Sequence, residues 1–262
     1  MNKVEITDAI FRVDGNAVVT SPHAAGPWDP RMQHGSAPAS LVVWAAERLP
    51  TPVPMSIARV TLDLMRPVPV APLTIETEVL REGRKIQLCG IKLKAGGSLV
   101  VSATVLKIKS QELMLPDGVE GPPLALPPPE DSREERNKVA CPFAGWVSMR
   151  SARGGFGQIG PAAVWFRVDK PLVEGEPISQ AMRAVVASDF TNGAAAALDF
   201  HQWTFINADL TISFARQPVG EWVLLDGEMW VGPDGRGLAM SKLADRRGYF
   251  GRAVQSLVIE KR

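Results

Sequence analysis

The sequence contains only two cysteines, Cys89 and Cys141, in 262 residues, and they lie far apart. Two cysteines do not make the disulfide framework of a small secreted domain, which favours a reducing compartment. The sequence also has no run of about 18 apolar residues, so no helix is expected to span a membrane. Residues 1–15 lack the apolar core of a signal peptide. Together these absences predict a cytoplasmic protein.

An excess of charge of one sign is missing as well. Lys and Arg number 29 against 28 Asp and Glu, which gives a formal net charge of +1. A chain with so little net charge has no overall electrostatic attraction to nucleic acid or to an anionic membrane, so neither is an expected partner. His23 and His201 have no metal-ligand spacing around them, and we expect neither a metal nor another cofactor. The apolar fraction of 45% is that of an ordinary globular protein, long enough for two small domains.

Residues 109–145 differ in composition from the rest of the chain. They contain a charged run at 130–136 and the prolines Pro116, Pro122, Pro123, Pro127, Pro128, Pro129 and Pro142. This composition cannot form a central strand and is typical of a surface linker. The sequence therefore predicts a first unit at 1–108, a linker at 109–145 and a second unit at 146–262.

The two units resemble each other. The alternating segment at 60–67 (VTLDLMRP) matches 210–218 (LTISFARQP) at an offset of 150, and both end in Arg and then Pro. Farther on, 97–99 matches 248–250 and 106–108 matches 257–259 at an offset of 151. One helix precedes the strands in each unit. The pattern predicts a duplicated α+β unit with one helix and an antiparallel sheet in each half, joined edge to edge or packed together. Chance similarity between amphipathic strands is the alternative.

The first helix is expected directly after His34. Ser36 is a suitable N-cap, and Pro38 is tolerated in the first turn, where a missing N–H costs nothing. Residues 41–46 are apolar all round, which is typical of a helix buried on most sides.

The second helix is expected to start near Pro177 and carries a polar residue on its apolar face. The face comprises Ile178, Ala181, Met182, Val185 and Val186 and then reaches Asp189. An ionised carboxylate is costly there, so Asp189 must be hydrogen-bonded, exposed in a cleft or protonated. Each of these makes it a candidate site residue. The alternative is that the helix ends earlier and Asp189 caps the turn at 189–193.

The last strand also carries a polar residue on an apolar face. Strand period places Gln255 on the side of Ala253, Leu257 and Ile259. Its amide needs partners, and a purely structural glutamine is the alternative. The offset of 151 makes Thr104 its counterpart in the first half.

An ordered set of segments resembles the type II (TesB-like) acyl-CoA thioesterases. The segments are 28–30 (WDP), 34–35 (HG), 165–167 (WFR), 186–190 (VASDF), 206–218 (INADL through FARQP) and 253–255 (AVQ). The resemblance implies an α+β double hot-dog fold, with each half wrapping an antiparallel sheet around one helix. It also implies a hydrolase of acyl-CoA in fatty acid metabolism, active as a dimer or higher homo-oligomer.

In that family an Asp, a Ser or Thr and a Gln together hold the attacking water. The resemblance places these roles on Asp189, Asn207 and Gln255. Asn207 departs from the family's hydroxyl, although an amide can also donate to a carboxylate or hold water. Strand parity groups Asn207 with Asp209 and Thr211, so a bulge or a strand start has to intervene.

The chemistry suits these residue types. A positioned Asp189 can deprotonate water, and Asn207 and Gln255 can orient it. N–H groups at a helix N-terminus can stabilise the oxyanion, and by analogy we place this role and substrate binding at Gly35 and Ser36. His34 is a further candidate for substrate binding, with a structural histidine as the alternative.

Three other interpretations stay open. A hot-dog hydratase or dehydratase would need a buried Asp and His acting together, and the second helix offers no such pair. A non-catalytic acyl-CoA or lipid-binding protein would have a decayed site, for which Asn207 is the main evidence. Glu47, late on the first helix, is a vestigial site residue or simply solvent-exposed.

Overall fold

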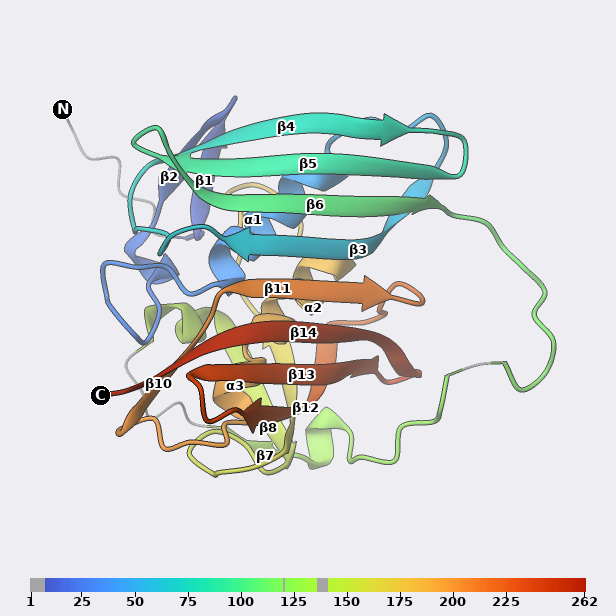
Figure 1. The fold of residues 1–262 in the computed structure, drawn as a ribbon. Coiled ribbons are helices and arrows are strands. Elements are labelled where there is room, and N and C mark those ends of the chain that lie inside the picture. Colours follow the sequence, from blue (N-terminus) through green and yellow to red (C-terminus); the bar gives the residue numbers. More distant parts are fainter. Residues whose placement is uncertain (1–7, 120, 136–140) are drawn as a thin grey trace.

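The computed structural model describes residues 8–119, 121–135 and 141–262, and its first half is one helix with a run of antiparallel strands (Figure 1). The elements up to Lys109 are β1 (Phe11–Asp14), β2 (Ala17–Thr20), the 3-10 turn η1 (Pro22–Ala24), α1 (Ser36–Glu47), β3 (Met55–Leu64), β4 (Leu73–Glu82), β5 (Ile86–Ala95) and β6 (Ser98–Lys109). The connection that follows, 110–119 and 121–128, contains no helix or strand.

The second half repeats this plan with additions. Its elements are η2 (Pro129–Asp131), β7 (Arg133–Glu134), η3 (Pro142–Trp146), β8 (Val147–Arg153), β9 (Ala162–Val168), α2 (Gln180–Asp189), α3 (Thr191–Ala194), β10 (Trp203–Asn207), β11 (Asp209–Phe214), β12 (Trp222–Val231), β13 (Arg236–Asp245) and β14 (Gly248–Lys261). The end of the Pro-rich segment pairs with this half, because Arg133 lies opposite Ser151. The unit boundaries at 108 and 145 stay a prediction.

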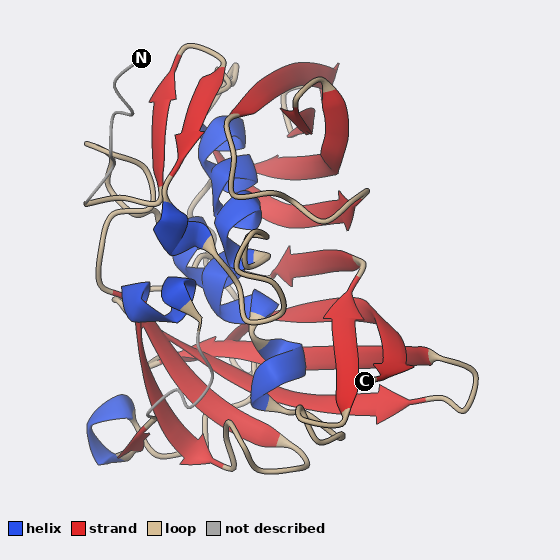
Figure 2. Ribbon diagram, turned by 90° about the vertical axis from the view of Figure 1, so that its left-hand side faces the viewer, coloured by secondary structure: helices blue, strands red, loops and turns tan. Residues whose placement is uncertain are grey.

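The described strands form one continuous sheet in the order β1-β2-β4-β5-β6-β3-β11-β14-β13-β12-β9-β8-β7, with β10 also paired to β14. The halves join where β3 and β11 run antiparallel, with Thr61 opposite Thr211. The edge-to-edge junction expected from the sequence is thus present, and it removes the two strand edges that separate halves would expose. The two longest helices, α1 and α2, lie along the inner side of this sheet (Figure 2).

The duplication is visible in the irregularities of the strands. β5 has a register shift between Leu93 and Lys94, and β13 has one between Leu243 and Ala244. These positions keep an offset of 150. Thr61 pairs with Thr104 and Thr211 pairs with Val254, so the two pairs also differ by 150. The counterpart of Gln255 is therefore Val105, and the expected match with Thr104 is wrong by one residue.

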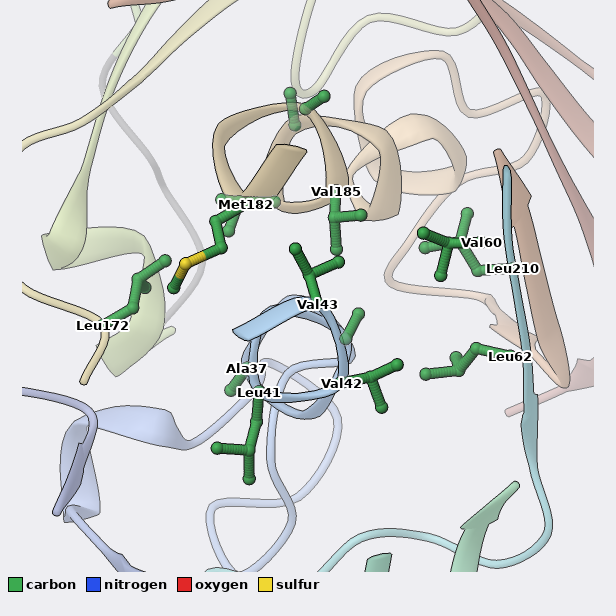
Figure 3. Close-up of a cluster of buried hydrophobic side chains, with 14 of the residues drawn as sticks. Ala37, Leu41, Val42, Val43, Val60, Leu62, Leu172, Met182, Val185 and Leu210 are labelled. Carbon is green, nitrogen blue, oxygen red and sulfur yellow. The ribbon is translucent and has the colours of Figure 1, made fainter. Parts of the chain in front are cut away.

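Helix α1 is buried on nearly all sides, as its composition predicts. Figure 3 shows Val42 directed towards the sheet residue Leu62 and Val43 directed towards the α2 residue Val185. All four side chains are almost fully buried. The expected N-cap is wrong, since α1 begins at Ser36 itself and Gly35 occupies the cap position. The hydroxyl of Ser36 turns towards α2 instead, with its oxygen 3.0 Å from the Val186 carbonyl oxygen.

Helix α2 begins a few residues after Pro177, at Gln180, because the side chain of Ser179 accepts a hydrogen bond from the Met182 N–H. Its apolar face is buried as predicted, and the helix includes Asp189. No helix in the described ranges is long and apolar enough to cross a membrane.

Candidate active site

Asp189 is the last residue of α2 and lies where the C-terminal end of α2 meets the N-terminal end of α1. Only 4% of the residue is exposed. The N-terminal end of a helix carries a partial positive charge, so α1 favours a carboxylate at this position. Of the three states expected for Asp189, the structure shows the hydrogen-bonded one, and the alternative that the helix ends before Asp189 is wrong.

Two amides converge on one oxygen of this carboxylate. The Nδ2 of Asn207 donates to Oδ1 over 3.0 Å, and the Nε2 of Gln255 lies 3.4 Å from the same oxygen. The Gln255 amide nitrogen is also 3.3 Å from the backbone oxygen of Asp189. The Oε1 of Gln255 is buried and has no hydrogen-bond partner among the described residues. A buried acceptor of this kind favours a ligand that can donate a hydrogen bond.

The second carboxylate oxygen faces the first half of the chain. The Oγ of Ser36 lies 3.2 Å from Oδ2, and the Nδ1 of His34 lies 3.0 Å from it. The Ser36 backbone N–H also points at His34 Nδ1 over 3.2 Å. One ring nitrogen serves one of these contacts at a time: with a hydrogen, it donates to Asp189, and without one, it accepts from Ser36.

Aromatic rings fix the plane of His34. Its ring stacks on Phe143 at a centroid distance of 5.1 Å and tilts against Phe190 at 4.4 Å. Phe190 directly follows Asp189, so the same contact ties the histidine to the end of α2. The imidazole is therefore held in place, which is what a side chain needs to contact a substrate reproducibly.

Gly35 lets the two helices approach. Its φ of −59° is ordinary, so the requirement is space and not backbone conformation. A Cβ at this position would lie 2.6 Å from Oδ1 of Asp189 and 2.8 Å from Oδ2, well inside van der Waals contact. Only glycine at position 35 allows the Asp189 carboxylate to lie against the start of α1.

The position of Asn207 follows from a break in the strand. β10 ends at Asn207, β11 begins at Asp209, and Ala208 between them is a bend. The break shifts the strand parity, so Asn207 faces the same side as Phe205 and Leu210 rather than Thr211. The intervening irregularity that the sequence required is thus present.

The structure brings all six predicted residues into one cluster: His34, Gly35, Ser36, Asp189, Asn207 and Gln255. The pairing of His34 with Asp189 does not follow from the spacing on the second helix, which contains no histidine. The motif at 34–35, next to a helix start, was the available signal.

The cysteines show no sign of nucleophilic activation. Cys89 is fully buried, with its Sγ 3.3 Å from Gln87 Oε1, and burial raises the pKa of its thiol. Cys141 lies close enough to Asp189 for their charges to interact, but burial above all raises its pKa to about 11. At neutral pH Cys141 is therefore a thiol, and the thiolate is the nucleophilic form of cysteine.

Glu47 lies at the opposite end of the helix pair, where α1 ends beside the start of α2. Its side chain is hydrogen-bonded to Ser179, and partial burial raises the pKa of the carboxyl group. The residue remains exposed to solvent, as one of the two sequence interpretations expected.

Solved structures share this fold over nearly their full length. A putative thioesterase from Novosphingobium aromaticivorans is 18% identical, with a TM-score of 0.74 over 95% of this chain and 98% of the other. A hot-dog protein of unknown function from Alicyclobacillus acidocaldarius is 18% identical, with a TM-score of 0.77 over 97% of each chain. The acyl-CoA thioesterase II TesB2 from Mycobacterium marinum is 18% identical, with a TM-score of 0.71 over 95% of each chain. The predicted α+β double hot-dog fold is confirmed.

Comparison of the sequence with family models identifies the family. No curated protein sequence matches this chain. A family model described as the acyl-CoA thioesterase N-terminal domain matches residues 24–108, and one described as the acyl-CoA thioesterase C-terminal domain matches residues 120–259. Both halves are thus accounted for, and the chain belongs to the acyl-CoA thioesterase family.

Proposed function

We propose that this thioesterase hydrolyses acyl-CoA to a free acid and CoA by the attack of a water molecule that Asp189 deprotonates. One observation supports this most directly: the amides of Asn207 and Gln255 meet on a single oxygen of a buried carboxylate. Two donors on Oδ1 fix the orientation of the base. The unpartnered Oε1 of Gln255 supplies an acceptor for a hydrogen of the same water.

The reaction then needs no covalent enzyme intermediate. Asp189 takes a proton from water while the water oxygen bonds to the thioester carbonyl carbon. The carbon–sulfur bond breaks as the carbonyl re-forms, and the CoA sulfur leaves with the proton that Asp189 took from the water, which restores the carboxylate. Asn207 fills the position of the family's hydroxyl, since its Nδ2 donates to Asp189.

The first half contributes the substrate contacts in this proposal. The developing oxyanion is placed near the N-terminal end of α1, at the backbone of Gly35 and Ser36. His34 contacts the thioester from the side of the aromatic rings that hold it. The 146–262 unit supplies the base and the amides, so the site requires both halves.

A hot-dog hydratase is the second candidate, and the 3.0 Å contact between His34 Nδ1 and Asp189 Oδ2 favours it. A buried Asp and His side by side can add water across the double bond of an enoyl-CoA. A non-catalytic acyl-CoA-binding protein is the third candidate.

A panel of acyl-CoA substrates separates the three candidates. Saturated acyl-CoAs and crotonyl-CoA are supplied to the protein, and free thiol and the enoyl chromophore are followed in parallel. A hydrolase releases thiol from both kinds of substrate. Loss of the enoyl chromophore without thiol release would identify a hydratase, and binding without either signal would identify a binding protein.

Two further predictions accompany this function. The chain is expected to work in fatty acid metabolism in the cytoplasm, and to form a dimer or a higher homo-oligomer. Sedimentation of the purified protein tests the oligomeric state.

A further inference from the structure

A second apolar cluster lies beside the candidate site and is separate from the main core. It contains Ala196, Phe205, Met229, Ala239, Leu257 and Ile259, with half-buried aromatic residues packed against it. The strands β10 and β14 make it continuous with the site. Asn207 and Phe205 face the same side of β10, and Gln255 and Leu257 face the same side of β14.

Polarity along these two strands changes from one end to the other. Asn207 lies opposite Leu257, and two residues farther on Phe205 lies opposite Ile259. Two residues of an antiparallel strand advance about 7 Å. An acyl thioester has the same profile, with a polar carbonyl followed by an apolar chain.

Three aromatic rings close the far end of this cluster. Trp28 comes from the first half, and its ring lies 4.8 Å from that of Phe200 and edge-on to that of Phe205 at 5.3 Å. The guanidinium of Arg262 lies 5.3 Å from the Trp28 ring centroid. Trp28 thus stands between the apolar strand surface and the outside of the molecule.

The opposite side of the site is less suited to an acyl chain. The rings there, Phe143 and Phe190, belong to the main core around α1 and α2, and both are 5% exposed or less. A chain inserted among them would have to displace close-packed core side chains. Phe205, Leu257 and Ile259 are buried to a similar extent, but the half-buried side chains of Leu198 and Phe200 that cover them lie in a loop. A chain that displaces these loop side chains leaves the packing around α1 and α2 intact.

We propose that the surface formed by Phe205, Leu257 and Ile259 binds the acyl chain, and that Trp28 limits this chain to short lengths. The inference rests on the proposed thioester hydrolysis and deepens it by naming the substrate class. Short acyl chains end before Trp28, while long chains collide with it.

Trp28→Ala tests the limit, since Trp28 lies in a loop and its removal breaks no strand pairing. The matched control is Trp230→Ala on β12, where the residue is 59% exposed. Initial rates with butyryl-, octanoyl- and palmitoyl-CoA give kcat/KM for each protein. We expect the unaltered protein to favour butyryl-CoA. Trp28→Ala should raise the octanoyl-to-butyryl ratio about tenfold or more, while Trp230→Ala leaves it unchanged.

The outcomes separate this inference from the function beneath it. An unchanged ratio in folded Trp28→Ala, with thiol released by the unaltered protein, overturns the acyl limit alone. Absence of thiol release from every substrate by the unaltered protein overturns both proposals. If Trp28→Ala does not fold, as judged by circular dichroism, Trp28→Phe and Phe200→Ala provide the same test with a smaller expected shift.

Discussion

The helices α1 and α2 pack side by side in opposite directions, and the two ends of this pair carry different chemistry. At one, Asp189 ends α2 and contacts Ser36 at the start of α1. At the other, Glu47 ends α1 and contacts Ser179 at the start of α2. The first carboxylate is buried and the second is exposed. A carboxylate beside a serine at a helix start is therefore common to both halves and does not by itself make a site.

The strand residues account for the difference. Asn207 lies opposite Leu257 in the second half, and its counterpart Ile57 lies opposite Lys107 in the first. The register likewise makes Val105 the counterpart of Gln255. The first half thus lacks both amides that hold Asp189. The comparison teaches that the amides, more than the carboxylate, distinguish the candidate site from its counterpart.

The largest effect is expected when the two halves are separated. A polypeptide of residues 8–118 retains α1 and β1 to β6 but exposes the edge of β3 and the face of α1 that packs on α2. We expect it to be unfolded or aggregated and inactive. Circular dichroism and size-exclusion chromatography measure this. A stable, active monomer would contradict the shared site.

The second largest effect is expected from adding one methyl group at Gly35, where the start of α1 lies against the end of α2. Gly35→Ala forces its Cβ against the Asp189 carboxylate, so the base must shift. A misplaced reacting group costs up to about 10²-fold, and we expect kcat to fall by about that factor. Gly145→Ala is the control, because no described atom lies within 4 Å of its Cβ. Equal kcat values for the two variants would show that the close approach is unimportant.

The amides provide a sharper test. Asn207→Leu should lower kcat by about 10²-fold with less change in KM, since the oriented water matters most in the transition state. Asn207→Thr should retain most activity, because a hydroxyl also donates. Gln255→Leu should resemble Asn207→Leu, and the double variant should lose less than the product of the two factors. Full independence of the two effects, or a normal rate for Asn207→Leu, would remove Asn207 from the site.

A smaller difference between the halves concerns stability. Arg216 donates two hydrogen bonds to the buried Asp245, whereas the register makes Ala95 the first-half counterpart of Asp245. Burial opposes the charge on Asp245, but hydrogen bonds from Arg216 and two backbone N–H groups leave its pKa below the usual value. A carboxyl group with a lowered folded pKa stabilises the fold above its unfolded pKa of about 4 and loses this effect as pH falls through the folded value.

Asp245→Asn should therefore destabilise the protein by about 3 kcal/mol at pH 7, the scale for removing one partner of a buried pair. The loss relative to the unaltered protein should shrink as the pH falls below 4. Urea unfolding at several pH values measures both quantities. A difference that stays constant down to pH 2 would assign the effect to packing rather than to charge.

Local patterns identified much of the candidate site. Helical spacing placed Asp189 on a buried face, and strand alternation did the same for Gln255. Strand parity indicated that an irregularity lies between Asn207 and Thr211, but the sequence did not show that it lies at Ala208. The family resemblance, and not periodicity, suggested that these three residues meet.

Contacts between distant segments were harder to predict. His34 and Asp189 are separated by most of the chain, and spacing within one helix says nothing about which helix ends meet. The role of Ser36 was mistaken because its type suits an N-cap, while the structure uses its hydroxyl across the helix pair. The match of Thr104 with Gln255 failed because similar apolar strand segments also align at an offset of 151, whereas the strand register keeps the offset of 150 to the end.

The central claim is that Asp189, and not its counterpart Glu47, is the base. Thiol release from a good acyl-CoA substrate, measured for Asp189→Asn and Glu47→Gln, tests it most directly, because both changes remove a charge and preserve shape. We predict that Asp189→Asn lowers kcat by about 10²-fold or more while remaining folded, and that Glu47→Gln keeps nearly full activity. An active Asp189→Asn protein, or an equal loss in both variants, would contradict the account.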